Sequence, residues 1–365
     1  MKKVAALLCL GLVIGGIVAL SNQRGYAKVR APEFAGDAGD WINSPPLSMK
    51  EIVRTHRLPG GQPVHAVLVD FWEYTCVNCV RTFPYLKSWN ERYAKAGLLI
   101  VGIHTPEFGF AHDKANVQAA VKRFDLPYPI LVDSGYKNWQ AYANQYWPRH
   151  YLINDEGVIV DDHAGEGGYR ETELQIQALL KKANPSIVLP KPMAPVRDTD
   201  SENAVCYPTT PEVYAGYQRG RLSNPGGFAP DRTGTYREPS TYEDGAPVLV
   251  GRWEATPEAV IHASRNPDEF VALAYHALDA HAVIKPEDGK PLRVYVTQDG
   301  KAVEKADKGA DIHYAPDGRS YITVDAPRMY DLTKNAKFGR HILRLSSDSD
   351  RFGLYSFTFG SCTVS

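Results

Sequence analysis

One continuous apolar run, Val64 to Phe71, most constrains what this chain can fold into. The run VHAVLVDF is rich in β-branched residues, and it has no polar face to present to water, so it predicts a strand buried on both sides. Phe83, Leu86 and Tyr93 follow at helical spacing, which predicts a helix with one stripe facing the strand. A buried strand followed by such a helix is typical of an α/β layer fold.

The same alternation continues through the first half of the chain, from about Trp41 to Ala183. Apolar runs bounded by glycine, proline and turn residues predict strands, and apolar residues three or four apart predict helices. Proline residues after the 115–124 pattern rule out its continuation as a helix. We expect strands at 98–104, 130–132, 150–154 and 158–163, and helices at 115–124, 136–143 and 170–183.

The chain of 365 residues is too long for one ordinary core, and its composition changes near residue 185. Four prolines in residues 185–195 disfavour both helix and paired strand, and we assign residues 186–204 to a linker between domains. Short strand-like runs separated by turn residues then predict an antiparallel β-sandwich over residues 205–365. The α/β domain accordingly covers residues 35–185.

The N-terminus has the pattern of an export signal. Two lysines precede an apolar stretch, and small residues around Ala27 fit a cleavage site, so we assign residues 1–27 to a signal peptide, with an uncleaved membrane anchor as the alternative. Both interpretations place the body of the protein in the periplasm or another extracytoplasmic space. With 41 basic and 42 acidic residues interspersed, nucleic acid is not an expected partner.

Cys76 and Cys79, with two residues between them, stand at the start of the first helix. A structural zinc site would need a second pair of ligands at short spacing, and the sequence offers none. A purely structural disulfide here would close a very short loop and remove little chain entropy. Redox exchange explains the spacing directly: at a helix N-terminus the Cys76 thiolate is stabilised and attacks, and Cys79, one turn further, resolves the mixed disulfide.

These residues resemble the active site of thioredoxin-like proteins. The resemblance implies that Asp70 is a buried acid that assists deprotonation of Cys79, and that Pro84 kinks the active-site helix. It also implies that Pro148 is a cis-proline beside the cysteines, with the backbone of Trp147 available to bind an extended substrate strand.

A narrower resemblance covers nearly the whole mature chain. The motifs DWINSPPLSMKEI, VDFWEYTCVNC, HTPEF and GEGGYRETE, followed by a β domain ending in FTFG, are similar to the extracytoplasmic part of DipZ-type thiol:disulfide interchange proteins. The resemblance implies a jelly roll of galactose-binding type for the second domain, with a carbohydrate as a candidate ligand. DipZ proteins carry an electron-conducting membrane region ahead of this part, so we expect another chain to supply the membrane electron donor. Glu73, close to Cys76, departs from the usual pattern and would oppose thiolate formation.

Other residues are assigned with an alternative left open. Trp72, Tyr74 and Trp147 are expected to form an apolar collar around the sulfur atoms for docking partner chains, with plain packing as the alternative. His150 lies just beyond Pro148, and we expect it outside the site, with a position that reaches the site as the less favoured alternative. Aromatic residues of the β domain could stack on sugar rings, but alternating aromatics are more often core: Tyr242, Trp253, Tyr275, Tyr314 and Tyr355.

Cys206 and Cys362 lie at opposite ends of the β domain. Because the termini of a sandwich are often close together, we expect a structural disulfide between them, with two free buried thiols as the alternative. Its loop of over 150 residues would stabilise the fold by about 4 to 5 kcal/mol in the chain-entropy description.

The sequence thus predicts an exported thiol:disulfide oxidoreductase that needs no organic cofactor and no metal and acts on protein thiols and disulfides of the cell envelope. A peroxidase on the same fold is one alternative, although the Pro and Thr expected before a peroxidatic cysteine are absent from DFWEYTCVNC. A carbohydrate- or partner-binding protein with an ancillary redox pair is the other.

Overall fold

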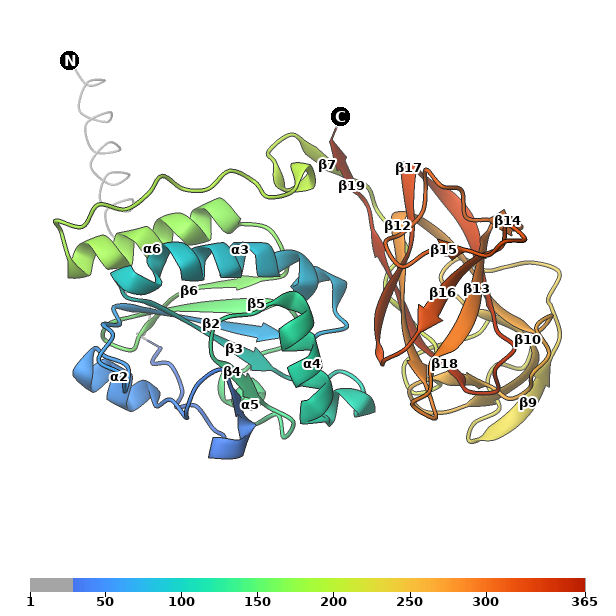
Figure 1. The fold of residues 1–365 in the computed structure, drawn as a ribbon, viewed down its shortest axis with the longest axis horizontal. Coiled ribbons are helices and arrows are strands. Elements are labelled where there is room, and N and C mark those ends of the chain that lie inside the picture. Colours follow the sequence, from blue (N-terminus) through green and yellow to red (C-terminus); the bar gives the residue numbers. More distant parts are fainter. Residues whose placement is uncertain (1–28, 365) are drawn as a thin grey trace, which may run out of the picture.

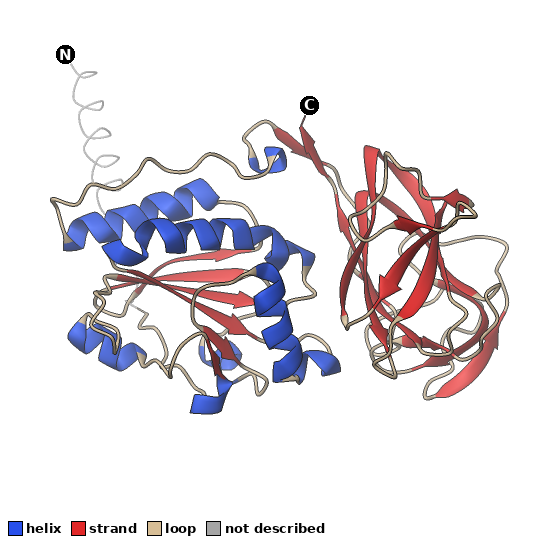
Figure 2. Cartoon of the chain, in the orientation of Figure 1, coloured by secondary structure: helices blue, strands red, loops and turns tan. Residues whose placement is uncertain are grey.

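The computed structural model describes residues 29–364 and divides them into an α/β domain, a linker and an all-β domain (Figure 1). Figure 2 shows the helices gathered in the first domain and the strands dominating the second. The assigned signal or anchor, residues 1–27 with Cys9, lies outside the described residues. Among residues 29–364 we find no helix long and apolar enough to cross a membrane.

The first domain is built on a mixed, six-stranded sheet in the order β1-β4-β3-β2-β5-β6. The central strand β2 runs parallel to β3 and antiparallel to β5, and all seven of its residues are buried, as a strand covered on both faces requires. The strands are β1 Trp41–Ile42, β2 Ala66–Trp72, β3 Leu98–His104, β4 Ile130–Val132, β5 Arg149–Asn154 and β6 Ile159–Ala164.

Alternation along β2 divides the core into two layers. Leu68 and Trp72 face the cluster formed with α3, α4 and α6, whereas Val67 and Phe71 face the cluster formed with α2 and α5. This alternation puts Asp70 on the α3 side of the sheet. The helices are α2 Met49–Thr55, α3 Val77–Tyr93, α4 Lys114–Phe124, α5 Lys137–Ala141 and α6 Tyr169–Ala183, with short 3₁₀ turns η1 Ala38–Asp40, η2 Ala94–Ala96, η3 Gly109–His112 and η4 Asp198–Asp200.

The linker lies along the outside of α3 and α6 before it reaches the second domain (Figure 1). Its backbone is held by side chains of those helices: the Gln177 amide donates to the carbonyl of Pro190, and Glu173 accepts from the amide of Met193. The Tyr85 hydroxyl accepts from the amide of Val196. The proline-rich linker is therefore docked on the first domain rather than free.

The second domain is antiparallel and strand-rich, as expected. Its strands join in one eleven-stranded sheet instead of two separate ones, because the long strands β12 and β17 continue from one layer into the other, and β12 also pairs with β18. The pairings β12-β10-β11-β18-β12 close a small barrel. The strands are β8 Val213–Tyr214, β9 Arg232–Tyr236, β10 Val248–Ala255, β11 Val260–His262, β12 Phe270–Pro286, β13 Leu292–Gln298, β14 Lys301–Ala302, β15 His313–Tyr314, β16 Ser320–Val324, β17 Arg328–Ser346 and β18 Phe352–Gly360.

Two further strands form a separate ribbon where the linker meets the C-terminus. β7 Ala204–Cys206 pairs with β19 Cys362–Val364, and Cys206 stands directly opposite Cys362. A disulfide joins these two residues, as the sequence predicted. The bond ties the start of the β domain to its end.

Candidate active site

The loop after β2 places Cys76 at the N-cap of α3. Its Sγ accepts a hydrogen bond from the backbone N–H of Cys79 at 3.3 Å, so sulfur occupies the position that a serine or aspartate oxygen usually takes at a helix start. The sulfur thus lies beside N–H groups that the helix leaves without backbone partners, at the positive end of the helix dipole. Cys76 is half-buried, whereas Cys79 is fully buried, so an incoming partner meets Cys76.

Cys79 lies one turn inward, beneath Cys76. Burial raises the pKa of the Cys79 thiol well above its usual range, and the hydrogen bond to Cys76 raises it further. Cys79 therefore stays protonated at neutral pH until a base takes its proton. This division, an accessible sulfur and a buried thiol, is what attack followed by resolution requires.

The difference between the two thiols is testable by alkylation. When the reduced protein is treated with iodoacetamide at pH 7, we expect carboxamidomethylation of Cys76 and almost none of Cys79, because Cys79 is both inaccessible and protonated. Peptide mass mapping over time reads both sites. In guanidinium chloride the two should react at similar rates, and equal labelling in the native state would contradict the assignment.

The turn before β5 completes the rim of the site. The Trp147–Pro148 peptide bond is cis, and the Cys76 thiol lies 3.9 Å from the carbonyl oxygen of Trp147, to which it donates. The Trp147 ring packs on Trp139, with ring centroids 4.3 Å apart. The backbone before Pro148 thus reaches the accessible sulfur, where the sequence placed it.

Asp70 lies in the sheet on the α3 side, fully buried. His150 is its direct partner in the antiparallel β2–β5 register, and its Nε2 is 3.1 Å from Asp70 Oδ1. Neither atom makes a hydrogen bond of good geometry among the described residues. The structure therefore places His150 beside Asp70, which is the less favoured of the two positions expected for this residue.

Trp72 and Tyr74 do not form the docking collar that the sequence suggested. Both are core residues, 0% and 3% exposed, because Trp72 shares the inward face of β2 and Tyr74 stacks on His104. The Trp72 ring packs edge-on against Phe83 of α3. Of the three expected collar residues, Trp147 alone is part-exposed.

The unusual acid Glu73 is directed into the protein. Its carboxylate accepts hydrogen bonds from the backbone and hydroxyl of Thr75, which shapes the loop that leads to Cys76. The other carboxylate oxygen lies 3.7 Å from Nε2 of His104, and both residues are fully buried. Glu73 thus has a structural role in the loop besides any effect of its charge on Cys76.

The β domain packs beside the active-site helix, a contact that no sequence pattern indicated (Figure 1). Val77, the residue after Cys76, shares a buried apolar cluster with Phe108 and with Tyr355 of the β domain. Glu107, also of the first domain, accepts hydrogen bonds from Tyr214 and Arg219 of the second. Burial raises the pKa of Glu107, with Glu73 contributing, while Arg219 opposes the rise.

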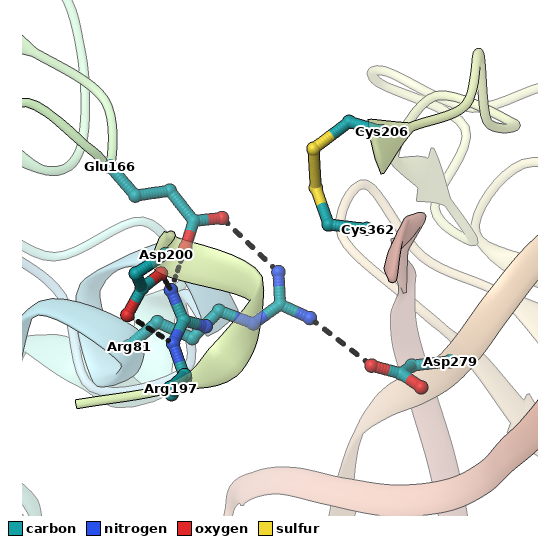
Figure 3. The surroundings of a disulfide bond; sticks show 7 residues. All are labelled: Arg81, Glu166, Arg197, Asp200, Cys206, Asp279 and Cys362. Carbon is teal, nitrogen blue, oxygen red and sulfur yellow. Dashed lines mark hydrogen bonds and ion pairs between the residues drawn. A yellow bond between two sulfur atoms is a disulfide. The ribbon is translucent and has the colours of Figure 1, made fainter. Parts of the chain in front are cut away.

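A second contact links the domains near the disulfide. Arg81, on α3, lies between Glu166 of the first domain and Asp279 of β12 (Figure 3), at 3.1 and 3.6 Å respectively. Arg197 of the linker also pairs with Glu166. The active-site helix is therefore connected to both the linker and the β domain.

Comparisons with known proteins agree with this geometry. The Redoxin family model matches residues 39–179, and the model described as Thioredoxin like C-terminal domain matches residues 210–360. Protein DipZ of Mycobacterium tuberculosis is 33% identical over 310 residues, which is 80% of this chain and 41% of the relative. The chain thus spans less than half the length of the DipZ proteins it matches.

Shorter relatives match the first domain over most of their own length. Thiol-disulfide oxidoreductase YkuV of Bacillus subtilis is 26% identical over 41% of this chain and 93% of the relative. Thiol-disulfide oxidoreductase ResA of Bacillus cereus is 25% identical over 48% of this chain and 92% of the relative. The DipZ match covers more of the chain than either domain contains, so it extends into both. The first domain is therefore similar to thioredoxin-like thiol-disulfide oxidoreductases, and the chain resembles the DipZ proteins across both of its domains.

Proposed function

We propose that the chain is exported and exchanges disulfides with proteins of the cell envelope through Cys76 and Cys79. The observation that carries the proposal is the geometry at the start of α3, where the Cys76 sulfur caps the helix above the buried Cys79. The backbone carbonyl of Trp147 lies 3.9 Å from the Cys76 sulfur, so an extended chain can bind along this segment.

The reaction follows from the two sulfur environments. In the reductive direction, the Cys76 thiolate attacks a substrate disulfide and releases one substrate thiolate. Cys79 then loses its proton and attacks the Cys76 sulfur, which releases the second substrate thiolate and leaves a Cys76–Cys79 disulfide. Two electrons pass from the enzyme dithiol to the substrate, and the reverse sequence oxidises a substrate dithiol. Asp70 is the proposed acceptor of the Cys79 proton, since it is the buried acid beneath the helix and its charge acts on Cys79.

The proposal extends to partners outside this chain. A donor must return two electrons to the Cys76–Cys79 disulfide after each reductive turnover, and we propose that a membrane protein supplies them. The β domain is proposed to be a carbohydrate-binding-like jelly roll, on its resemblance alone. The aromatic residues named for sugar stacking do not form a shared binding site, because Trp253, Tyr275 and Tyr355 are buried in the domain.

Exchange with a defined protein substrate tests the proposal. Reduced protein mixed with insulin should reduce the insulin disulfides and acquire one Cys76–Cys79 disulfide per chain, read by alkylation and peptide mass mapping. The same samples report whether Cys206–Cys362 stays bonded throughout. Failure to exchange with insulin or with glutathione disulfide, together with peroxide turnover or glycan binding, would replace this function by one of the alternatives.

A further inference from the structure

Asp70 and His150 form a buried pair because strands β2 and β5 lie side by side in the sheet. The two residues are 80 positions apart in the chain and directly opposite each other in the β2–β5 register, so their side chains share one face of the sheet. Asp70 is fully buried and His150 is 3% exposed, with 3.1 Å between Oδ1 and Nε2. A buried carboxylate without a hydrogen-bond donor is costly, and His150 is the one ion-pair partner that Asp70 has within residues 29–364.

The pair lies beneath the thiol that must lose a proton. The charge of Asp70 contributes to raising the pKa of Cys79 on α3 and of Tyr128 on the loop before β4. His163 of β6 stands opposite His150 in the next register, where its ring nitrogen contacts the carbonyl of Glu166. These three groups, Cys79, Tyr128 and His163, are the titratable neighbours of the pair on α3, the β4 loop and β6.

We propose that His150 exchanges a proton with Asp70 while Cys79 resolves the mixed disulfide. His150 therefore acts on Cys79 through Asp70 and does not contact the reacting sulfur atoms itself. This inference rests on the proposed function and concerns its second step. Asp70 takes the proton from the Cys79 thiol, and His150 Nε2 takes it from Asp70, which restores the carboxylate. The Cys79 thiolate then attacks the Cys76 sulfur, the mixed disulfide breaks, and the substrate thiolate leaves. In the opposite direction the imidazolium returns the proton through Asp70 as Cys79 leaves the disulfide.

The burial of the two residues fits this order of transfer. Asp70 has no exposed surface, so a proton on its carboxyl group needs another group to carry it outward. His150 retains a small exposed area and stands three residues after the part-exposed Trp147. A histidine can accept and release a proton near neutral pH, which an asparagine or glutamine at this place cannot do.

A reagent that releases one coloured thiolate at each step allows the attack by Cys76 and the resolution by Cys79 to be timed separately. Reduced protein mixed rapidly with excess 5,5′-dithiobis(2-nitrobenzoate) should release one chromophore when Cys76 attacks and a second when Cys79 resolves. For His150→Asn, we expect the first phase to change by less than about twofold and the second to slow about tenfold or more at pH 7. The second phase should regain speed at higher pH, so its pH profile moves to the alkaline side.

Matched variants distinguish proton transfer from packing. His163→Asn removes the neighbouring histidine, and we expect both phases to keep wild-type rates. Asp70→Asn should slow the second phase, and Asp70→Asn/His150→Asn should be no slower than Asp70→Asn alone, because both residues serve one transfer. His150→Gln provides a second side chain if His150→Asn folds poorly by circular dichroism.

The outcomes separate this inference from the function beneath it. A wild-type protein that releases no chromophore faster than a free thiol fails the proposed function itself. If the wild type shows both phases and folded His150→Asn or His150→Gln keeps the wild-type pH profile of the second, His150 only packs against Asp70 and the inference is wrong. Additive slowing in the double variant would overturn it as well.

Discussion

Replacing Cys76 by serine is expected to reduce insulin reduction at least about a thousandfold, to the level of a protein without an accessible thiol. Serine preserves the helix cap, since its hydroxyl can accept the hydrogen bond from the backbone of Cys79. It cannot ionise at neutral pH, however, and it does not attack sulfur. The loss should therefore be one of chemistry and leave folding intact, which circular dichroism can check beside the turbidity assay.

Cys79→Ser is the matched variant for this prediction. It leaves the attacking sulfur in place and removes the resolving one, so a mixed disulfide between Cys76 and the substrate should accumulate and be visible on a non-reducing gel. Cys76→Ser should trap nothing. Retention of more than a tenth of wild-type activity by Cys76→Ser, or trapping through residue 79, would show that the order of the two sulfurs is wrong.

Loss of the Cys206–Cys362 disulfide is expected to have the largest effect on stability. The bond closes a loop across the whole β domain, with a sequence separation of 156. Its removal raises the conformational entropy of the unfolded domain, which lowers the free energy of the unfolded state by about 4 to 5 kcal/mol in the chain-entropy description. Cys206→Ser/Cys362→Ser should lower the free energy of unfolding of this domain by up to that amount. Guanidinium chloride unfolding followed by hydrogen–deuterium exchange of β-domain peptides measures it, because five of the six tryptophans lie in the first domain.

The control uses the redox chemistry of the disulfide itself. In a Cys76→Ser/Cys79→Ser background, a strong reductant can act on Cys206–Cys362 alone, and it should destabilise that protein by the same amount as the double serine substitution. The position of the bond, beside the Arg81 contacts with Glu166 and Asp279 (Figure 3), makes interdomain docking a second readout. An unchanged unfolding midpoint after reduction would mean that the strand pairing of β7 with β19 holds the domain without the bond.

Local patterns predicted much of the first domain, because the bounds of its strands and helices follow from apolar runs, turn residues and helical periodicity within short segments. The strands β3 Leu98–His104 and β4 Ile130–Val132 have the predicted bounds, since each is an apolar run between clear turn signals. The helix with the two cysteines was also predicted, although it begins at Val77, with Cys76 as its cap. The short helix Met49–Thr55 was not predicted, because seven residues give too little periodicity to stand out.

Patterns in the sequence misplaced residues whose surroundings come from distant segments. Trp72 and Tyr74 flank an accessible cysteine in the sequence, yet α3 and His104 cover them in the fold. The long strands β12 and β17 merge what the spacing of short runs suggested were separate sheets. The apolar contact of Val77 with Tyr355 joins two domains and has no local sequence signal.

By itself, the sequence determined the α/β class of the first domain and the cysteine pair at a helix start, whereas the Cys206–Cys362 bond was an expectation that the structure confirmed. Period, turn residues and cysteine spacing are local quantities, and few folds satisfy them together. Tertiary structure alone decided that His150 faces Asp70 and that the β domain lies beside the active-site helix. Strand register and domain packing depend on hydrogen bonds and apolar contacts between segments far apart in the chain, which no local pattern encodes.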